Sequence, residues 1–225
     1  MRAALNESNE SVASLLSAAG VLAVAEVRQA AEAVSVAEAL LGGGVRAMEI
    51  AFRDVRFFDE SERAIAAVRE RCPQMLVGAA TVVNPAIADR ALASGAQFVL
   101  SAGFNPKTVE HCVARGIPIV PGVCTPGEIE QALEFGLTTL KFFPAEVCGG
   151  TAMLSALSGP YPQVRFVASG GIGASNAASY LACRNVAAVS GSWVSPKSAI
   201  FRGDFSAITA LAAEASAQFA AQRTE

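Results

Sequence analysis

Residues 117–143 read IPIVPGVCTPGEIEQALEFGLTTLKFF and carry a pattern of strand, helix and strand. The apolar runs 117–120 and 138–143 are short and rich in Ile, Val, Leu and Phe, which is typical of buried parallel strands. Between the two runs, Thr125 followed by proline is a favourable helix start, and Gly136 is a favourable helix stop. The stretch therefore predicts one βαβ unit.

The same alternation runs through the whole chain, because eight short apolar runs are separated by helical segments. Strict β–α alternation predicts a parallel sheet with helices outside, and eight units favour a closed (β/α)8 TIM barrel over an open sheet. We predict a single domain over residues 1–225, in which residues 1–20 form an N-terminal helical extension. The predicted strands are VLAVAEV (21–27), VRAMEI (45–50), QMLVGA (74–79), QFVL (97–100), IPIV (117–120), TTLKFF (138–143), VRFVA (164–168) and VAAVS (186–190).

Composition excludes several classes of protein. Of the 225 residues, 52% are hydrophobic and 16% are charged, so the chain can bury a large core. The net charge of −3 argues against nucleic acid as a partner, and no apolar run is long enough to span a membrane. The N-terminal sequence has no secretory signal, which predicts a cytoplasmic protein.

Metal binding is also not expected. None of the five cysteines forms a CxxC pair, and the chain has one histidine, His111, in a predicted outer helix. These are too few ligands of the right type for a structural zinc site. We predict no metal and no cofactor, with reduced and mostly buried thiols.

Lys141 is the residue in this pattern that indicates chemistry. It is one of only three lysines, and it lies between Leu140 and Phe142 inside a predicted buried strand. Burial disfavours the charged form of an amine, and a neutral lysine is a nucleophile for ketones. The alternative is a lysine that reaches the rim of the barrel or pairs with a carboxylate, for which Glu49 and Glu146 are available.

Two charged residues close to the second predicted strand are further candidates. Glu49 ends the run VRAMEI, and a carboxylate that points into the barrel mouth can move protons. Arg53 follows four residues later and can bind a substrate carboxylate through two hydrogen bonds. The alternative for Arg53 is a surface cluster with Asp54 and Arg56.

Two loops that follow the seventh and eighth strands predict an anion site. ASGGIGASN (168–176) is a glycine-rich turn that enters a helix, and SGSW (190–193) offers further amides and the Ser192 hydroxyl. Amides at a helix N-terminus bind phosphate, and TIM barrels often bind phosphate between these two loops.

Taken together, these residues resemble the bacterial 2-keto-3-deoxy-6-phosphogluconate / 4-hydroxy-2-oxoglutarate aldolase family. The similarity covers nearly the whole chain, and the most specific of its motifs is LKFFPAE. The matching segments, in order, are GGVRAMEIAFR (43–53), VGAATVVNP (77–85), SGAQFVLSAGF (94–104), IPIVPGVCTPGEIEQALEFG (117–136), LKFFPAE (140–146), GPYPQVRFVASGGI (159–172) and GSWVSP (191–196).

The resemblance implies a role for each candidate. Lys141 would form a Schiff base with pyruvate, Glu49 would be the acid/base group, and Arg53 with Thr81 would bind the substrate carboxylate. The family's phosphate-binding positions correspond to Ser169, Gly170, Gly171, Gly191 and Ser192. The implied partners are a 2-keto acid substrate and pyruvate, and the implied assembly is a homotrimer.

The chain also departs from the family pattern. Glu26, at the end of the first strand, adds a negative charge near the mouth, which we expect to weaken binding of an anionic substrate. Ala80, Ala102, Ser169 and Ser190 replace other residues near the site. The implied substrate is 2-keto-3-deoxy-6-phosphogluconate, and the alternatives are 4-hydroxy-2-oxoglutarate or the 6-phosphogalactonate analogue. Alternatives of another class are a phosphosugar isomerase or synthase and a non-catalytic metabolite-binding barrel.

Overall fold

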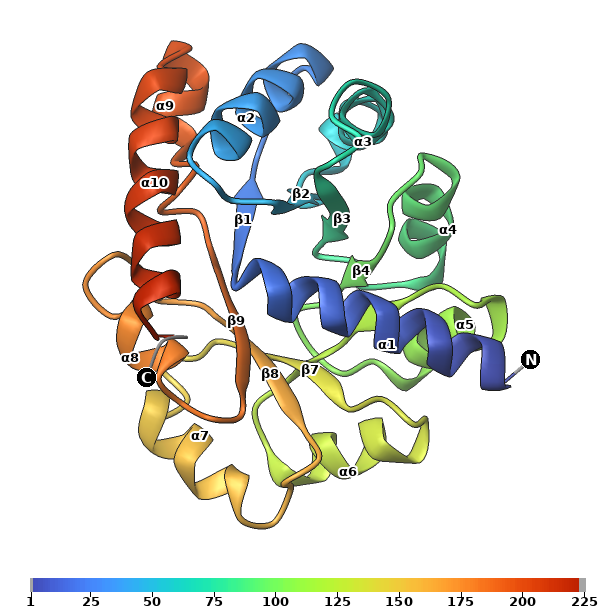
Figure 1. The fold of residues 1–225 in the computed structure, drawn as a ribbon. Helices are drawn as coiled ribbons and strands as arrows, with labels where there is room; N and C mark the ends of the chain where they lie inside the picture. The colour runs from blue at the N-terminus through green and yellow to red at the C-terminus, as the bar shows by residue number, and fades with distance from the viewer. Residues whose placement is uncertain (1, 223–225) are drawn as a thin grey trace.

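A computed structural model describes residues 2–222, with the side chains of residues 9–222. All strands run parallel in one sheet of order β5-β4-β3-β2-β1-β9-β8-β7-β6. The helices surround this sheet as an outer layer, which is the TIM-type barrel that the alternation predicts (Figure 1). The strands are β1 (Val21–Ala25), β2 (Ala47–Ala51), β3 (Leu76–Ala80), β4 (Val99–Leu100), β5 (Ile119–Val120), β6 (Gly122–Val123), β7 (Thr139–Phe142), β8 (Arg165–Ser169) and β9 (Val186–Gly191).

The structure has nine strands rather than eight because the fifth one is divided by Pro121. Proline has no backbone N–H to donate, so Pro121 interrupts the strand and separates β5 from β6. The β5 half pairs with β4, and the β6 half pairs with β7. The Pro121 carbonyl still accepts a hydrogen bond from the Lys141 amide at 2.8 Å, so the barrel stays closed around this point.

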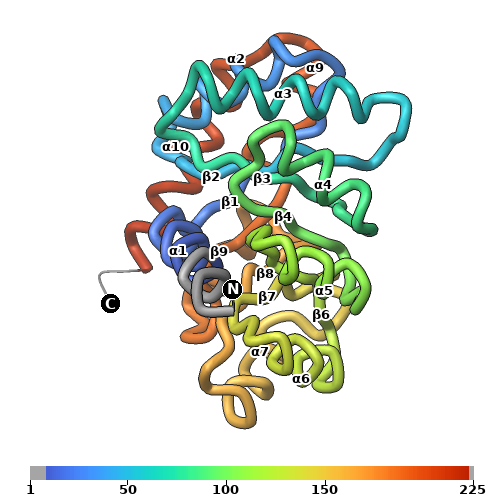
Figure 2. Tube along the Cα trace, turned by 90° about the vertical axis from the view of Figure 1, so that its right-hand side faces the viewer, coloured from blue at the N-terminus to red at the C-terminus, as the bar shows by residue number. Residues whose placement is uncertain are grey.

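Three helices begin with a side-chain cap followed by proline, which is the start that the sequence predicts for the helix after Thr125. Asn84, Asn105 and Thr125 each accept a hydrogen bond from an amide in the first turn of the helix that follows, and each precedes a proline. Figure 2 shows helices on opposite sides of the strands. They are α1 (Arg2–Ala19), α2 (Ala30–Gly42), the short 3-10 helix η1 (Val55–Phe57), α3 (Phe58–Arg71), α4 (Pro85–Ala93), α5 (Pro106–Arg115), α6 (Pro126–Glu134), α7 (Gly150–Ser158), α8 (Ala177–Leu181), α9 (Lys197–Arg202) and α10 (Phe205–Gln222).

Two apolar clusters form the core. The larger one lies between the strands and the outer helices. The smaller one fills the barrel lumen with side chains from several strands, Leu22, Phe98 and Val167 among them. Helix α1 supplies Val12 and Leu16 to this second cluster, so the N-terminal helix is part of the core and does not extend away from the domain.

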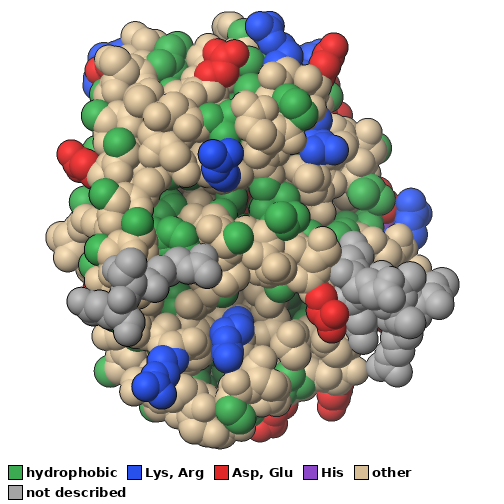
Figure 3. Space-filling model, in the orientation of Figure 1, with side chains coloured by type: hydrophobic (Ala, Val, Ile, Leu, Met, Phe, Trp, Pro, Cys, Tyr) green, Lys and Arg blue, Asp and Glu red, His purple; other side chains and the backbone are tan. Residues whose placement is uncertain are grey.

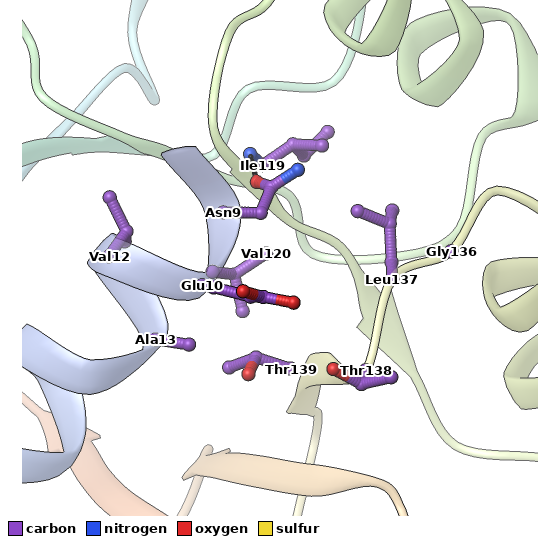
Figure 4. A pocket seen from close by; sticks show the side chains of 10 residues that line it. All are labelled: Asn9, Glu10, Val12, Ala13, Ile119, Val120, Gly136, Leu137, Thr138 and Thr139. Carbon is purple, nitrogen blue, oxygen red and sulfur yellow. Dashed lines mark hydrogen bonds between the residues drawn. The ribbon is translucent and has the colours of Figure 1, made fainter. Parts of the chain in front are cut away.

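Helix α1 lies across the end of the barrel where the strands begin (Figure 1). Figure 4 shows the small pocket that remains between α1 and the starts of β5 and β7. Asn9 of α1 accepts a hydrogen bond from the Ile119 amide at 3.1 Å, which satisfies a donor at the start of β5. Because α1 covers this end, a substrate has to enter from the opposite end, where the strands finish.

Charged residues make up 16% of the sequence. On the face shown in Figure 3 they are scattered and do not form a basic field. Within residues 2–222, no helix has the length and apolar character needed to cross a bilayer. All five cysteines are free thiols, and burial raises the pKa of Cys112 to about 12.

We expect Leu16→Ala to lower the free energy of unfolding by about 2–4 kcal/mol, because Leu16 is fully buried in the lumen cluster. Urea unfolding measures this change. Leu15→Ala is the matched control, since the neighbouring Leu15 is 48% exposed and its truncation should change stability by less than about 1 kcal/mol. Equal losses for the two variants would contradict the packing of α1 against the lumen.

Candidate active site

Lys141 and Glu49 meet inside the barrel. Lys141 lies on β7 and Glu49 on β2, and these strands are not neighbours in the sheet. The Lys141 Nζ atom is nevertheless 3.5 Å from Glu49 Oε1, so the contact crosses the lumen. Lys141 is 7% exposed and Glu49 is fully buried. Of the two carboxylates that the sequence analysis names as possible partners of Lys141, Glu49 is therefore the one in contact with it.

A buried ion pair of this kind is poor evidence for stability. Removing two charges from water costs several kcal/mol per ion, and apolar replacements of similar volume are often as stable. The distance of 3.5 Å is also longer than a normal hydrogen bond. An amine and a carboxylate held this way in an apolar lumen suit chemistry, because the amine can attack a carbonyl and the carboxylate can exchange protons.

Ser190 is a third member of this group, and its role was not predicted from the sequence. It is fully buried on β9, and its hydroxyl donates a hydrogen bond to Glu49 Oε1 at 2.9 Å. Glu49 Oε2 is buried and has no hydrogen-bond partner among residues 9–222. The Oε1 atom of Glu49 therefore accepts a hydrogen bond from Ser190 and faces Lys141, while Oε2 is free to contact a ligand.

Glu146, the other carboxylate available to Lys141 in the sequence, has a different partner. It accepts a short hydrogen bond from the hydroxyl of Tyr180, which is buried on α8. Burial and this hydrogen bond both raise the pKa of Tyr180 above its usual range. Glu146 also packs under the loop after β8, since a Cβ atom on Gly171 would lie 2.5 Å from Glu146 Cγ.

The structure brings the predicted anion-binding residues into one pocket at the mouth of the barrel. Gly170 and Gly171 have φ angles of 94° and 83°, a region that other residues rarely adopt. A Cβ atom on Gly191 would lie 2.5 Å from the Trp193 ring, so glycine is required there as well. The pocket is lined by Val24, Arg53, Phe143, Ser169, Gly170, Gly171, Ile172, Gly191 and Ser192.

Phe143 connects this pocket to the buried pair. Its ring lines the pocket, and the Lys141 Nζ atom lies 5.5 Å from the ring centroid. Arg53 lines the same pocket, with a side chain that is 55% exposed. The amine and the glycine-rich loops are thus close enough for one small molecule to contact both.

Thr81 does not line this pocket, but its backbone is unusual. It follows β3 with a φ angle of 63°, and it is the non-glycine residue with positive φ in the described part of the chain. A β-branched residue in this region is strained, and such strain is often found at functional sites. Nothing in the sequence GAATVVNP (78–85) indicated this backbone conformation.

The expected effect of Glu26 needs correction, because its charge is compensated. Glu26 Oε2 accepts a hydrogen bond from Arg53 Nη1 at 3.4 Å, and Glu26 Oε1 forms a close ion pair with Lys197 of α9. Two positive charges therefore surround one negative charge at this side of the mouth. Arg56 is not part of this group, since Asp54 binds it through two oxygens, and its hydrogen bonds lower the pKa of Asp54 to about 2.

The remaining candidates have structural roles. His111 lies on α5 and contacts Asp89 of α4 at 2.9 Å, which fits the prediction of an outer-helix residue. No group of three or more His, Cys, Asp or Glu side chains within the described residues is arranged to hold a metal ion.

Comparison with known proteins agrees with this geometry. The family model described as "Aldolase: KDPG and KHG aldolase" matches residues 12–211. The chain belongs to the KDPG and KHG aldolase family. A 2-dehydro-3-deoxy-phosphogluconate aldolase of Treponema pallidum is 50% identical over 191 residues, which cover 85% of this chain and 89% of the relative. The KHG/KDPG aldolase of Escherichia coli K12 is 39% identical, over 91% of this chain and 94% of its own.

A solved structure of the family resembles the barrel closely. The KDPG aldolase of Legionella pneumophila, with pyruvate captured at low pH as a covalent carbinolamine intermediate, has a TM-score of 0.84 and 35% identity. The match covers 89% of this chain and 96% of that one. The family's structures thus include one in which pyruvate is bound covalently.

The backbone conformation at Thr81 can be tested by comparing Thr81→Gly with Thr81→Ala. Both variants lose the hydroxyl, but only alanine keeps a Cβ atom at positive φ. We expect the glycine variant to be the more stable by about 0.5–1 kcal/mol, because the left-handed penalty of alanine exceeds the entropy cost of glycine. Urea unfolding measures the difference. An alanine variant as stable as the glycine variant would show that Thr81 is not strained.

Proposed function

We propose that this chain is a class I (Schiff-base) aldolase that reversibly cleaves 2-keto-3-deoxy-6-phosphogluconate into pyruvate and glyceraldehyde 3-phosphate. The observation that carries the proposal is the Lys141 amine, 7% exposed in the lumen and 3.5 Å from the Glu49 carboxylate. Family membership and relatives named for this activity support the same reaction.

The reaction begins at Lys141. Transfer of a proton from the Lys141 ammonium to Glu49 frees the amine, which adds to the C2 ketone of the substrate and forms a carbinolamine. Loss of water gives an iminium ion, which is a stronger electron sink than the ketone. Glu49 supplies a proton to the departing hydroxyl, and its position beside the amine suits this transfer.

Cleavage of the C3–C4 bond follows. Glu49, ionised again, accepts the proton of the C4 hydroxyl, directly or through water, and the electrons of the C3–C4 bond move into the iminium to give an enamine. The aldehyde leaves at this step. Protonation at C3 and hydrolysis of the iminium then release pyruvate and restore the lysine, so all atoms and protons balance.

The two ends of the substrate are assigned to different groups. Arg53 and Thr81 would hold the carboxylate, since a guanidinium and a hydroxyl donate to carboxylate oxygens. The phosphate would bind to amides and hydroxyls at the ends of β8 and β9, in the residues Ser169, Gly170, Gly171, Gly191 and Ser192. This division leaves the C2 ketone near Lys141.

We also propose 4-hydroxy-2-oxoglutarate as a second substrate, because the Escherichia coli relative is named a KHG/KDPG aldolase. The same lysine chemistry cleaves 4-hydroxy-2-oxoglutarate, whose second carboxylate would take the place of the phosphate. The proposal also includes the homotrimer that the family resemblance implies. A cytoplasmic location fits the five free thiols.

We expect Lys141 to be the residue that borohydride traps with pyruvate. It is the lysine in the lumen, whereas Lys107 and Lys197 lie in the first turns of α5 and α9. Incubation with pyruvate, reduction and peptide mass mapping locate the adduct. Lys141→Arg is the matched control and should give no adduct, because a guanidinium is not a usable amine nucleophile. An adduct on Lys107 or Lys197 would contradict the assignment of Lys141 as the Schiff-base lysine.

Glu49→Gln should lower kcat for aldol cleavage by about 10²–10⁴-fold, since it keeps the shape of the side chain and removes the titrating proton. Steady-state kinetics with coupled detection of pyruvate measures this change. Pyruvate trapping at long incubation times should persist, because the Lys141 amine is retained. A loss of less than about tenfold would mean that Glu49 only pairs with Lys141.

A further inference from the structure

The site contains one buried group that the proposed mechanism does not use, the hydroxyl of Ser190. It lies at the end of β9, next to Gly191, and is fully buried. Its register partners are Leu22 of β1 and Ser169 of β8. Glu49 lies on β2, the other neighbour of β1, so the Ser190–Glu49 hydrogen bond passes over β1 inside the lumen.

We propose that Ser190 is a positioning residue for the acid/base carboxylate, and this inference rests on the proposed function. Its hydroxyl holds Glu49 Oε1 at 2.9 Å, on the side of the carboxylate that faces Lys141. The carboxylate cannot then rotate freely. Oε2, which has no partner among residues 9–222, is left as the oxygen that exchanges protons with the substrate.

The direction of the hydrogen bond has an electrostatic consequence. An ionised carboxylate only accepts hydrogen bonds, so Ser190 donates when Glu49 is charged. A hydrogen bond to the charged form favours that form over the protonated one. Ser190 therefore stabilises the ionised carboxylate in the orientation that faces Lys141.

Few other groups lie close enough to influence the Glu49 carboxylate. The charged group that faces the Glu49 carboxylate is Lys141 of β7. The register partners of Glu49 on β1 and β3 are Val24 and Gly78, which do not titrate. Ser190 is thus the neutral donor on Glu49.

A buried serine could instead serve stability alone, because a buried hydroxyl needs a partner whatever its function. Ser195 shows this simpler case. It is 1% exposed, and its hydroxyl donates to the backbone carbonyl of Val24 at 2.9 Å. Ser195→Ala is therefore a matched control that removes one buried hydroxyl hydrogen bond without touching Glu49.

The experiment compares kcat and KM for aldol cleavage in the parent, Ser190→Ala, Ser190→Gly and Ser195→Ala proteins. Without Ser190 the Glu49 carboxylate can turn away from Lys141, so it is held less often in the position for proton transfer. We therefore expect kcat to fall by about tenfold in both Ser190 variants, which is part of the contribution of about 10²–10⁴-fold that a general acid/base group makes. KM should change by less than about threefold, since the carboxylate- and phosphate-binding groups are intact.

The controls decide between positioning and stability. Ser195→Ala should keep the parent's kcat, even if it lowers the midpoint of urea unfolding. Ser190→Thr retains a hydroxyl and should return kcat toward that of the parent. Values of kcat for Ser190→Ala and Ser190→Gly that equal the parent's would overturn the inference. If the alanine variant does not fold, the glycine variant, which also lacks the hydroxyl, gives the same comparison.

Failure of the proposed function would be distinguishable. A parent protein that forms no borohydride-trapped adduct with pyruvate is not the proposed aldolase. A parent that traps pyruvate, with Ser190 variants whose kcat equals the parent's, leaves the aldolase proposal intact and refutes only the role of Ser190.

Discussion

The ion pair between Lys141 and Glu49 is the interaction around which the barrel interior is organised. Parallel strands that close into a barrel send alternate side chains into one lumen, and here that lumen is filled mainly by apolar residues. Two charges in such a place carry a desolvation cost that packing does not offset. Helix α1 covers the end where the strands begin, so the pair communicates with solvent only through the mouth at the other end. That arrangement keeps bulk water away from the amine and fixes the direction from which a substrate arrives.

One segment of the chain holds both ends of the site in register. Lys141 and Phe143 belong to the same stretch as Ala145 and Glu146, whose amides donate to the Ser169 and Gly170 carbonyls at 2.8 Å and 3.1 Å. The loop after β8 is therefore bonded directly to the segment that carries the amine. Tyr180 of α8 also stabilises the contact between this segment and the loop through its hydrogen bond to Glu146. The position of the segment that carries Lys141 relative to the anion pocket is thus set by backbone hydrogen bonds.

The sequence predicted what depends on local patterns. Strand positions follow from short apolar runs, and helix starts follow from Asn84, Asn105 and Thr125, because both signals lie within a few residues. The division of the fifth strand was missed, although Pro121 is the cause. Ser190 and Glu49 are 141 positions apart, and Glu26 and Lys197 are 171 apart. Such contacts depend on strand register around the closed sheet, which composition and periodicity do not specify.

In the proposed mechanism, the groups that perform or position the chemistry are separate from those that recognise the substrate. Lys141, Glu49 and Ser190 are buried on strands of the barrel, where a change in one side chain disturbs its neighbours. Arg53, Glu26 and Lys197 lie at the rim, each at least one third exposed, and their contacts are screened by water and salt. Arg53 makes one contact of 3.4 Å with Glu26, which a substrate carboxylate can replace at little cost while Lys197 still neutralises Glu26. Substrate preference can therefore vary at the rim without altering the lysine chemistry in the lumen.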